Sequence, residues 1–166
     1  MIRKILATTR EKEVSLADEI ETTELYLNIE NIRFHNEIKF DISVDKSLSV
    51  DTIKIPGLIL QPFIENAIWH GLSSKKGTKK IQITIAEFQH THIKITISDN
   101  GIGRKKSAEI KQKKIHKKDS LGIKITEERL ENFSKDFINN YELEFVDLYE
   151  NEKAVGTEVV LKIPMK

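Results

Sequence analysis

The stretch "SDNGIG" (98–103) ends a segment in which apolar and polar residues alternate, "HIKITIS" (92–98). Alternation predicts a half-buried strand, so Asp99 is expected where the strand delivers a side chain to the sheet edge. Gly101 and Gly103 allow positive φ and a close approach of the backbone to another group. A carboxylate there is a fixed acceptor, suited to an exocyclic amino group such as that of adenine. Asp-Asn-Gly is also ordinary turn chemistry, so this stretch alone leaves both interpretations open.

Upstream, "GLILQPFIENAIWHGL" (57–72) predicts a helix that begins after Pro-Gly and ends at or soon after its last glycine. At 3.6 residues per turn, Pro62, Asn66 and His70 form one row, with Glu65 beside it. An Asn carbonyl suits a Mg²⁺ ion that keeps waters and shares phosphate oxygens. Glu65 could orient a water of that ion, and His70 could donate to a phosphate. For this helix alone, a solvated polar face is the better interpretation.

The remaining pattern predicts an α+β fold, with helices on one face of a mixed, mostly antiparallel sheet. Predicted helices cover 15–34, 57–72 and 121–138, and predicted strands cover 37–45, 51–55, 80–88, 92–99, 141–149 and 154–164. The first helix opens with a capping-box pattern, Ser15 with Asp18. Its broad apolar face fits either packing on the domain or dimerisation, and the sequence leaves both open.

Three further segments contain candidate functional residues. Residues 104–119 are strongly basic and lack a sustained period, which is typical of a solvated loop but also compatible with a cationic lid over a polyphosphate. Ser120, Leu121 and Gly122 lie where that loop meets the next helix, and free N–H groups at a helix start attract anions. Thr157 follows a glycine at the start of the last strand.

Length and composition limit the kinds of protein and of site that this sequence can form. The chain has 166 residues, a net charge of +1 and no cysteine. This length fits one domain, and the charge gives no support to a nucleic-acid partner. Thiolate metal sites and disulfides are excluded, and no apolar run reaches the roughly 18 residues that span a bilayer.

Taken in order, these segments resemble the Bergerat-fold ATP-binding module of the gyrase, heat-shock chaperone, histidine kinase and MutL superfamily. "LQPFIENAIWHGL" (60–72) is similar to the N box of sensor histidine kinases of the LytS/YehU type. "DNGIG" (99–103) and "SLGIKITEERL" (120–130) resemble the two glycine boxes, and "GTEVVLKIP" (156–164) resembles the closing strand. Four boxes in this order cover nearly the whole chain, and the fold expected is a two-layer α/β sandwich with an extra N-terminal helix.

The resemblance implies a role for each candidate residue, with ATP and Mg²⁺ as cofactors. Asn66 is expected to coordinate Mg²⁺, and Asp99 to bind the adenine amino group. Glu65 and His70 are the expected catalytic residues near metal and phosphates. The other expected ATP contacts are Gly101, Gly103, Ser120, Leu121, Gly122 and Thr157, with residues 104–119 as the lid.

Three positions depart from the family pattern. Pro62 stands where other superfamily members often carry Glu or Asn. Trp69 stands where a basic residue is common, which removes one expected phosphate contact. Ser120 replaces the first glycine of the second box. Trp69 and Ser120 keep open the alternative of a nucleotide-binding module without catalysis. A GHKL-type ATPase clamp is the other alternative, but such proteins usually place a general base one turn before the Asn, where Pro62 cannot serve.

The phosphoacceptor histidine motif of the family has no match among the five histidines. The chain is therefore expected to be a kinase fragment, with residues 1–35 as the end of a dimerisation region and 36–166 as the ATP-binding domain. Its expected partners are its own missing phosphoacceptor segment and a response regulator, within a homodimer of the full-length protein. The domain is expected to be cytoplasmic, with the full-length protein anchored in the bacterial inner membrane.

Overall fold

A computed structural model describes residues 13–112 and 121–165 of the chain. Its centre is a five-stranded sheet in the order β2-β4-β5-β7-β6, in which β2 and β4 are parallel and the other pairs are antiparallel. The strands are β2 (Ile38–Val44), β4 (Lys79–Phe88), β5 (His92–Asp99), β6 (Glu142–Glu150) and β7 (Lys153–Pro164). A separate pair, β1 (Glu13–Ser15) with β3 (Lys54–Pro56), lies outside this sheet.

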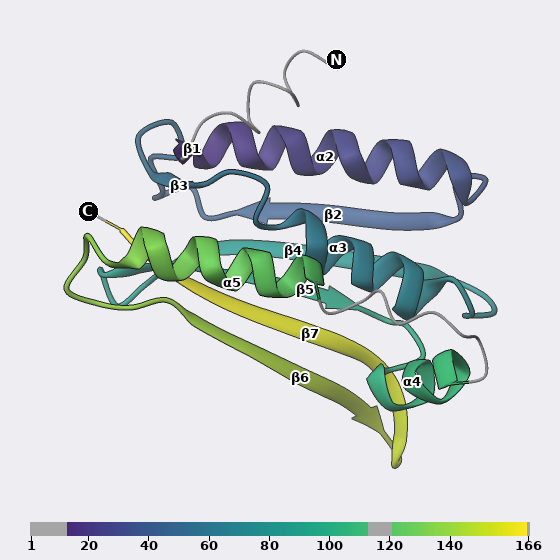
Figure 1. The fold of residues 1–166 in the computed structure, drawn as a ribbon. Coiled ribbons are helices and arrows are strands. Elements are labelled where there is room, and N and C mark those ends of the chain that lie inside the picture. The colour runs from purple at the N-terminus through teal and green to yellow at the C-terminus, as the bar shows by residue number, and fades with distance from the viewer. Residues whose placement is uncertain (1–12, 113–120, 166) are drawn as a thin grey trace.

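The helices gather on one face of the sheet (Figure 1). They are α2 (Leu16–Arg33), α3 (Gln61–Asn66), which continues as a π-helical segment (Ala67–Leu72), and α5 (Leu121–Ser134). A shorter helix, α4 (Arg104–Gln112), lies at one end of the sheet, near the turn between β6 and β7 (Figure 1). This is the α+β sandwich with an added N-terminal helix that the sequence predicted, and that prediction is confirmed.

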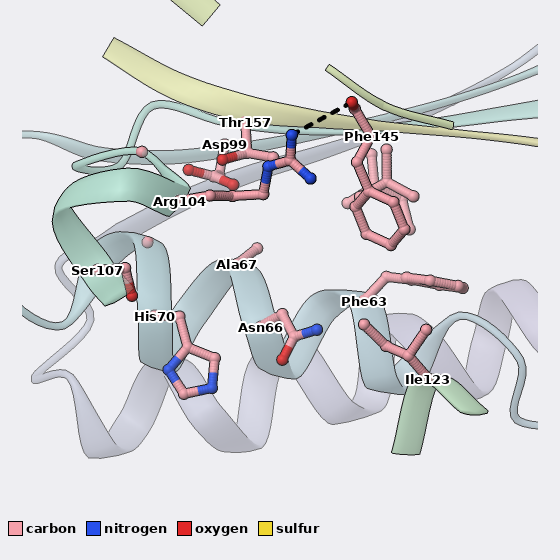
Figure 2. Close-up of a pocket in the computed structure, with 14 residues that line it drawn as sticks. Phe63, Asn66, Ala67, His70, Asp99, Arg104, Ser107, Ile123, Phe145 and Thr157 are labelled. Carbon is pink, nitrogen blue, oxygen red and sulfur yellow. Dashed lines mark hydrogen bonds between the residues drawn. The ribbon is translucent and has the colours of Figure 1, made fainter. Parts of the chain in front are cut away.

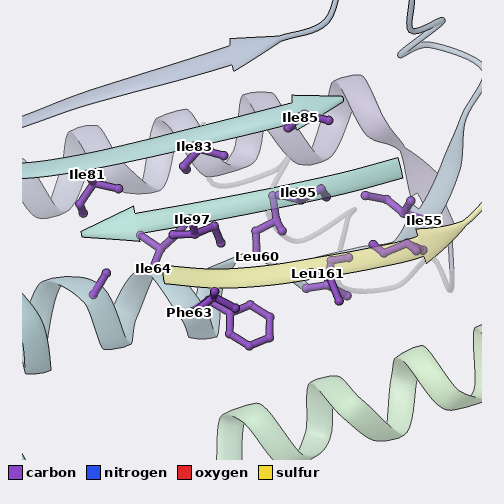
Figure 3. Packing of buried hydrophobic residues seen from close by; sticks show 14 of the residues in the cluster. Ile55, Leu60, Phe63, Ile64, Ile81, Ile83, Ile85, Ile95, Ile97 and Leu161 are labelled. Carbon is purple, nitrogen blue, oxygen red and sulfur yellow. The ribbon is translucent and has the colours of Figure 1, made fainter. Parts of the chain in front are cut away.

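The core forms between the sheet and its helices because alternate residues of β4 and β5 are isoleucines on the same face. Ile83 on β4 pairs with Ile97 on β5, and Ile85 pairs with Ile95, so four large side chains form one apolar surface. Phe63 and Ile64 of helix α3, together with Leu60 just before it, cover that surface (Figure 3). Burial of each such side chain contributes about 1.5–3 kcal/mol, which fixes α3 on the sheet.

Helix α2 packs on the domain. The predicted cap is confirmed, because the backbone N–H of Asp18 donates to the Ser15 hydroxyl over 3.0 Å. Leu16 and Leu27 belong to the common core, whereas Ile32 is 68% exposed. The division of the chain at residue 35 and a dimerisation role stay predictions.

The segment before α3 corrects one prediction. The helix was expected to begin after Pro56, but Leu58 has a φ of +57° and the helix begins at Gln61. The buried carboxylate of Glu19, on α2, accepts hydrogen bonds from the backbone N–H groups of Leu58 at 2.7 Å and Leu60 at 3.0 Å. A side chain from a distant helix therefore supplies the acceptor for these N–H groups, and it fixes where α3 begins.

Among the described residues, we find no helix with the length and apolarity needed to cross a membrane.

Candidate functional site

A cavity of about 310 Å³ opens beside α3, at the end of β5 where the SDNGIG stretch begins. Cavities of about 300–1,000 Å³ are typical of small-molecule sites. Figure 2 shows its walls: Asn66 and His70 from the α3 side, Asp99 and Thr157 from the sheet, and Arg104 and Phe145 at the rim. The cavity is lined by Phe63, Asn66, Ala67, His70, Gly71, Ile97, Asp99, Gly103, Arg104, Ser107, Ile123, Phe145, Thr157 and Val159.

Asp99 is the buried charge of this cavity, with 6% of its surface exposed. Its Oδ1 accepts a hydrogen bond from the Gly101 backbone N–H over 2.7 Å. Burial raises the pKa of Asp99 to about 6, against the opposing effects of the Gly101 and Thr157 backbone N–H groups and the charge of Lys75. At neutral pH the carboxylate is therefore mostly ionised and presents an acceptor to the cavity.

Strand register aligns three side chains across the sheet. Asp99 on β5 pairs with Thr157 on β7, and Thr157 pairs with Asp147 on β6. Directly opposed residues of an antiparallel pair point to the same face, so these three side chains share the face of the cavity. Thr157, predicted from the closing strand, thus lies beside Asp99.

A contact between two glycines joins the helix to the DNGIG loop. A Cβ at Gly101 would lie 2.5 Å from the backbone of Gly71, and a Cβ at Gly71 would lie 2.7 Å from Asp99 Oδ1. The Ile102 N–H donates to the Gly71 carbonyl over 3.1 Å. The helix was predicted to end at or soon after Gly71, and it ends one residue later, at Leu72. The absent side chain of Gly71 makes room for Asp99.

The two glycines of the first box have different roles. Gly103 has a φ of +79°, as predicted. Gly101 is not among the positive-φ residues, so only the predicted close approach applies to it.

Of the predicted polar row on α3, Asn66 and His70 line the cavity, and Pro62 and Glu65 do not. Glu65 Oε1 accepts a hydrogen bond from the Gln61 side-chain amide over 2.8 Å. Burial and then the Glu65 charge raise the pKa of Tyr26, which places Glu65 on the side of α2. The predicted catalytic role of Glu65 therefore stays a prediction without a cavity contact behind it.

Trp69 has a structural explanation. Its ring meets Phe34, at the end of α2, edge to face with centroids 5.4 Å apart. Trp69 is 45% exposed and does not line the cavity. Aromatic pairs of this kind contribute about 0.5–1.5 kcal/mol, so Trp69 helps to hold α2 on the π-helical segment.

The second glycine box is only partly described. Ser120 lies outside the described residues. Leu121 and Gly122 are exposed at the start of α5 and do not line the cavity, whereas Ile123 does. Their predicted phosphate contacts stay predictions.

The expectation of an irregular basic loop over residues 104–119 needs a correction, whereas their role as a lid stays a prediction. Residues 104–112 form α4, although the sequence showed no sustained period there, and residues 113–119 lie outside the description.

Sequence reasoning missed most of the apolar walls. Ile97 and Val159 lie on the alternating strands and could have been assigned to the cavity from register. Arg104 and Ser107 were expected only as part of the lid, and Phe145 was not assigned to the site, because their positions in the cavity depend on contacts between distant segments.

The fold is similar to that of the catalytic domains of histidine kinases. The catalytic domain of histidine kinase ThkA matches with a TM-score of 0.58 and 19% identity, over 92% of this chain and 95% of that one. ThkA in complex with the response regulator TrrA matches with a TM-score of 0.58 and 18% identity, over 99% of this chain and 46% of that one.

In sequence, the chain is related to the sensor histidine kinases of the LytS type. It is 29% identical to sensor protein LytS of Enterococcus faecalis over 153 residues, 92% of this chain and 25% of the relative. It is 39% identical to sensor histidine kinase BtsS of Escherichia coli K12 over 87 residues, 52% of this chain and 15% of the relative. The chain thus spans a quarter or less of these relatives, and no protein-family model matches it. The resemblance drawn from the motifs is confirmed.

Proposed function

We propose that this chain is the ATP-binding catalytic domain of a protein-histidine kinase, which transfers the γ-phosphoryl group of Mg-ATP to a histidine on a partner segment. The observation that carries the proposal is the buried Asp99 carboxylate, which faces a cavity whose opposite wall holds Asn66. A single buried acceptor beside apolar walls suits an adenine amino group and ring. The relatives are sensor kinases, which favours the kinase over the clamp and the non-catalytic module.

The residues present fit a magnesium nucleotide. No three His, Asp or Glu side chains gather as a metal site in the part of the chain that the structure describes. A Mg²⁺ ion would therefore take the Asn66 side-chain oxygen, phosphate oxygens and water, the arrangement that Mg²⁺ prefers over an all-protein cage. The ion would neutralise charge on the phosphates. His70 lines the same wall one turn on and is the proposed hydrogen-bond donor to a phosphate oxygen.

Catalysis by such a site is mostly positioning and charge neutralisation. Gly101 holds the Asp99 carboxylate in place, and the Gly71 contact fixes the loop against the helix that carries Asn66. In the intact protein, the phosphoryl group would pass to an aspartate of a response regulator. A homodimer, membrane attachment of the full-length protein and a cytoplasmic position of this domain belong to the same proposal.

Calorimetry with Mg-ATP tests the binding step on the wild type, Asn66→Ala and the exposed control Asn28→Ala. We expect wild type and control to bind alike, and Asn66→Ala to lose affinity in Mg²⁺ but not in EDTA. Equal loss in both conditions would refute a metal role for Asn66.

Phosphoryl transfer is tested by adding the histidine-bearing dimerisation segment of the Enterococcus LytS relative. Acid-labile phosphate on that segment is expected, and ATP hydrolysis without it would favour the clamp.

A further inference from the structure

The strongest feature outside the predicted site is Arg104, the first residue of α4. Its guanidinium binds Asp147 through two hydrogen bonds, from Nε to Oδ1 at 2.7 Å and from a terminal nitrogen to Oδ2 at 2.9 Å. A third contact reaches the Phe145 carbonyl at 3.5 Å, drawn in Figure 2. Two parallel bonds fix the plane of the guanidinium as well as its position.

The register of the strands relates the position of the Arg104 guanidinium to that of Asp99. Asp147, Thr157 and Asp99 form one row across β6, β7 and β5. Neighbouring strands lie about 4.8 Å apart, so Asp147 stands about 10 Å from Asp99 along that row. Arg104 lines the cavity while its head is held by the far end of the same row.

The surroundings suit a flat apolar ligand more than a phosphate. The guanidinium carbon lies 5.6 Å from the centre of the Phe145 ring, which also lines the cavity. The Asp147 carboxylate neutralises the Arg104 charge at 2.7 Å, which weakens the attraction for an anion elsewhere. A guanidinium paired in its plane still has a free flat face, and such faces stack on rings.

We propose that Arg104, held by Asp147, is a base-binding residue, whose guanidinium forms the outer wall against the purine ring and makes no phosphate contact. This assignment rests on the proposed nucleotide site, and it gives Arg104 a contact with the base in place of the lid contact with phosphates that the sequence suggested. The ion pair with Asp147 also ties the first turn of α4 to β6.

The test compares adenosine, ADP and Mg-ATP on the same variants, with adenosine measured by competition against ADP. We expect Arg104→Ala to weaken all three by a similar factor, about five- to twenty-fold, because all three share the base. Arg104→Lys should weaken them almost as much, since an ammonium ion keeps the charge but lacks the plane. Asp147→Ala should give a smaller uniform loss, because it releases Arg104 without removing it.

Lys105→Ala is the matched control, an exposed cation next along α4 that does not line the cavity, and it should bind like the wild type. Loss of ATP affinity with adenosine affinity retained would show a phosphate contact and overturn the assignment. Unchanged affinities in Arg104→Ala would overturn it too, while leaving the proposed function intact. Failure of the wild type to bind any adenine compound would overturn both. Since Arg104→Lys and Asp147→Ala report independently, a folding defect in one variant does not remove the test.

Discussion

Replacing Asp99 with Asn should make the nucleotide-free protein more stable while it destroys the proposed base site. The pKa of Asp99 is raised from 3.8 to about 6, mainly because burial disfavours its charge. A folded-state pKa above the unfolded one means that the native state holds the proton more tightly. The wild type therefore loses stability as pH rises through this window, and it remains less stable above it. An Asn side chain keeps an acceptor for the Gly101 N–H but carries no charge.

The magnitude follows from the two pKa values. At about 1.4 kcal/mol for each pKa unit, ionised Asp99 lowers the free energy of unfolding by about 3 kcal/mol at pH 7.5. With the same two values, the penalty at pH 5 is about 1.6 kcal/mol, because much of the carboxyl is already protonated in the folded state. The advantage of Asp99→Asn should thus shrink by about 1.4 kcal/mol between pH 7.5 and pH 5.

Urea unfolding followed by far-UV circular dichroism measures this difference at both pH values. Asp41→Asn is the control, an aspartate exposed on β2 that should change stability by less than about 0.5 kcal/mol at either pH. Equal or lower stability of Asp99→Asn at pH 7.5 would refute the burial argument. A gain that does not depend on pH would show that the charge is not its source.

Four further outcomes are expected. Affinity for Mg-ATP should fall about tenfold for each pH unit below about 6, as protonation removes the Asp99 acceptor; a flat calorimetric profile from pH 5 to 7 contradicts this. Glu19→Ala should lower the free energy of unfolding in urea by about 1–3 kcal/mol, because buried backbone N–H groups before α3 lose their acceptor; unchanged stability contradicts it. Gly71→Ala should reduce ADP affinity at least tenfold, because its Cβ would displace the Asp99 carboxylate, and unchanged affinity would contradict this. Trp69→Ala should destabilise the fold by about 1 kcal/mol and leave ADP affinity unchanged, and a loss of affinity would show that Trp69 contacts the ligand.

The sheet could be predicted because its rules are local. Strict alternation in residues 80–88 and 92–99 identified both strands and the end at which Asp99 stands. The short strand β1 was missed, since three residues carry no period and the strand exists only through its pairing with β3. The helix α4 was missed because eight cations spread over residues 104–118 conceal any apolar stripe.

The polar residues of the site could be predicted in part, because helical spacing is also a local rule. Helical spacing brought Asn66 and His70 to one wall, and it also selected Glu65, which faces α2 instead. Amino-acid pattern does not reveal a π-helical segment, because its wider turn depends on what the helix packs against. Here the neighbour is Gly101, and the contact with Gly71 joins segments far apart in the chain.

The contact of Arg104 with Asp147 could not be predicted either, because it also joins segments far apart in the chain. In the sequence it is one cation among many in a basic stretch. Only the fold brings Asp147 within 2.7 Å of it, by pairing β6 with β7 and β7 with β5. The register that aligns Thr157 with Asp99 therefore also places the carboxylate that holds Arg104. In the proposed site, one row of the sheet positions both the edge and the face of the base. A shift of β6 against β7 would disturb the Arg104 contact with the face and leave the Asp99 contact with the edge unchanged.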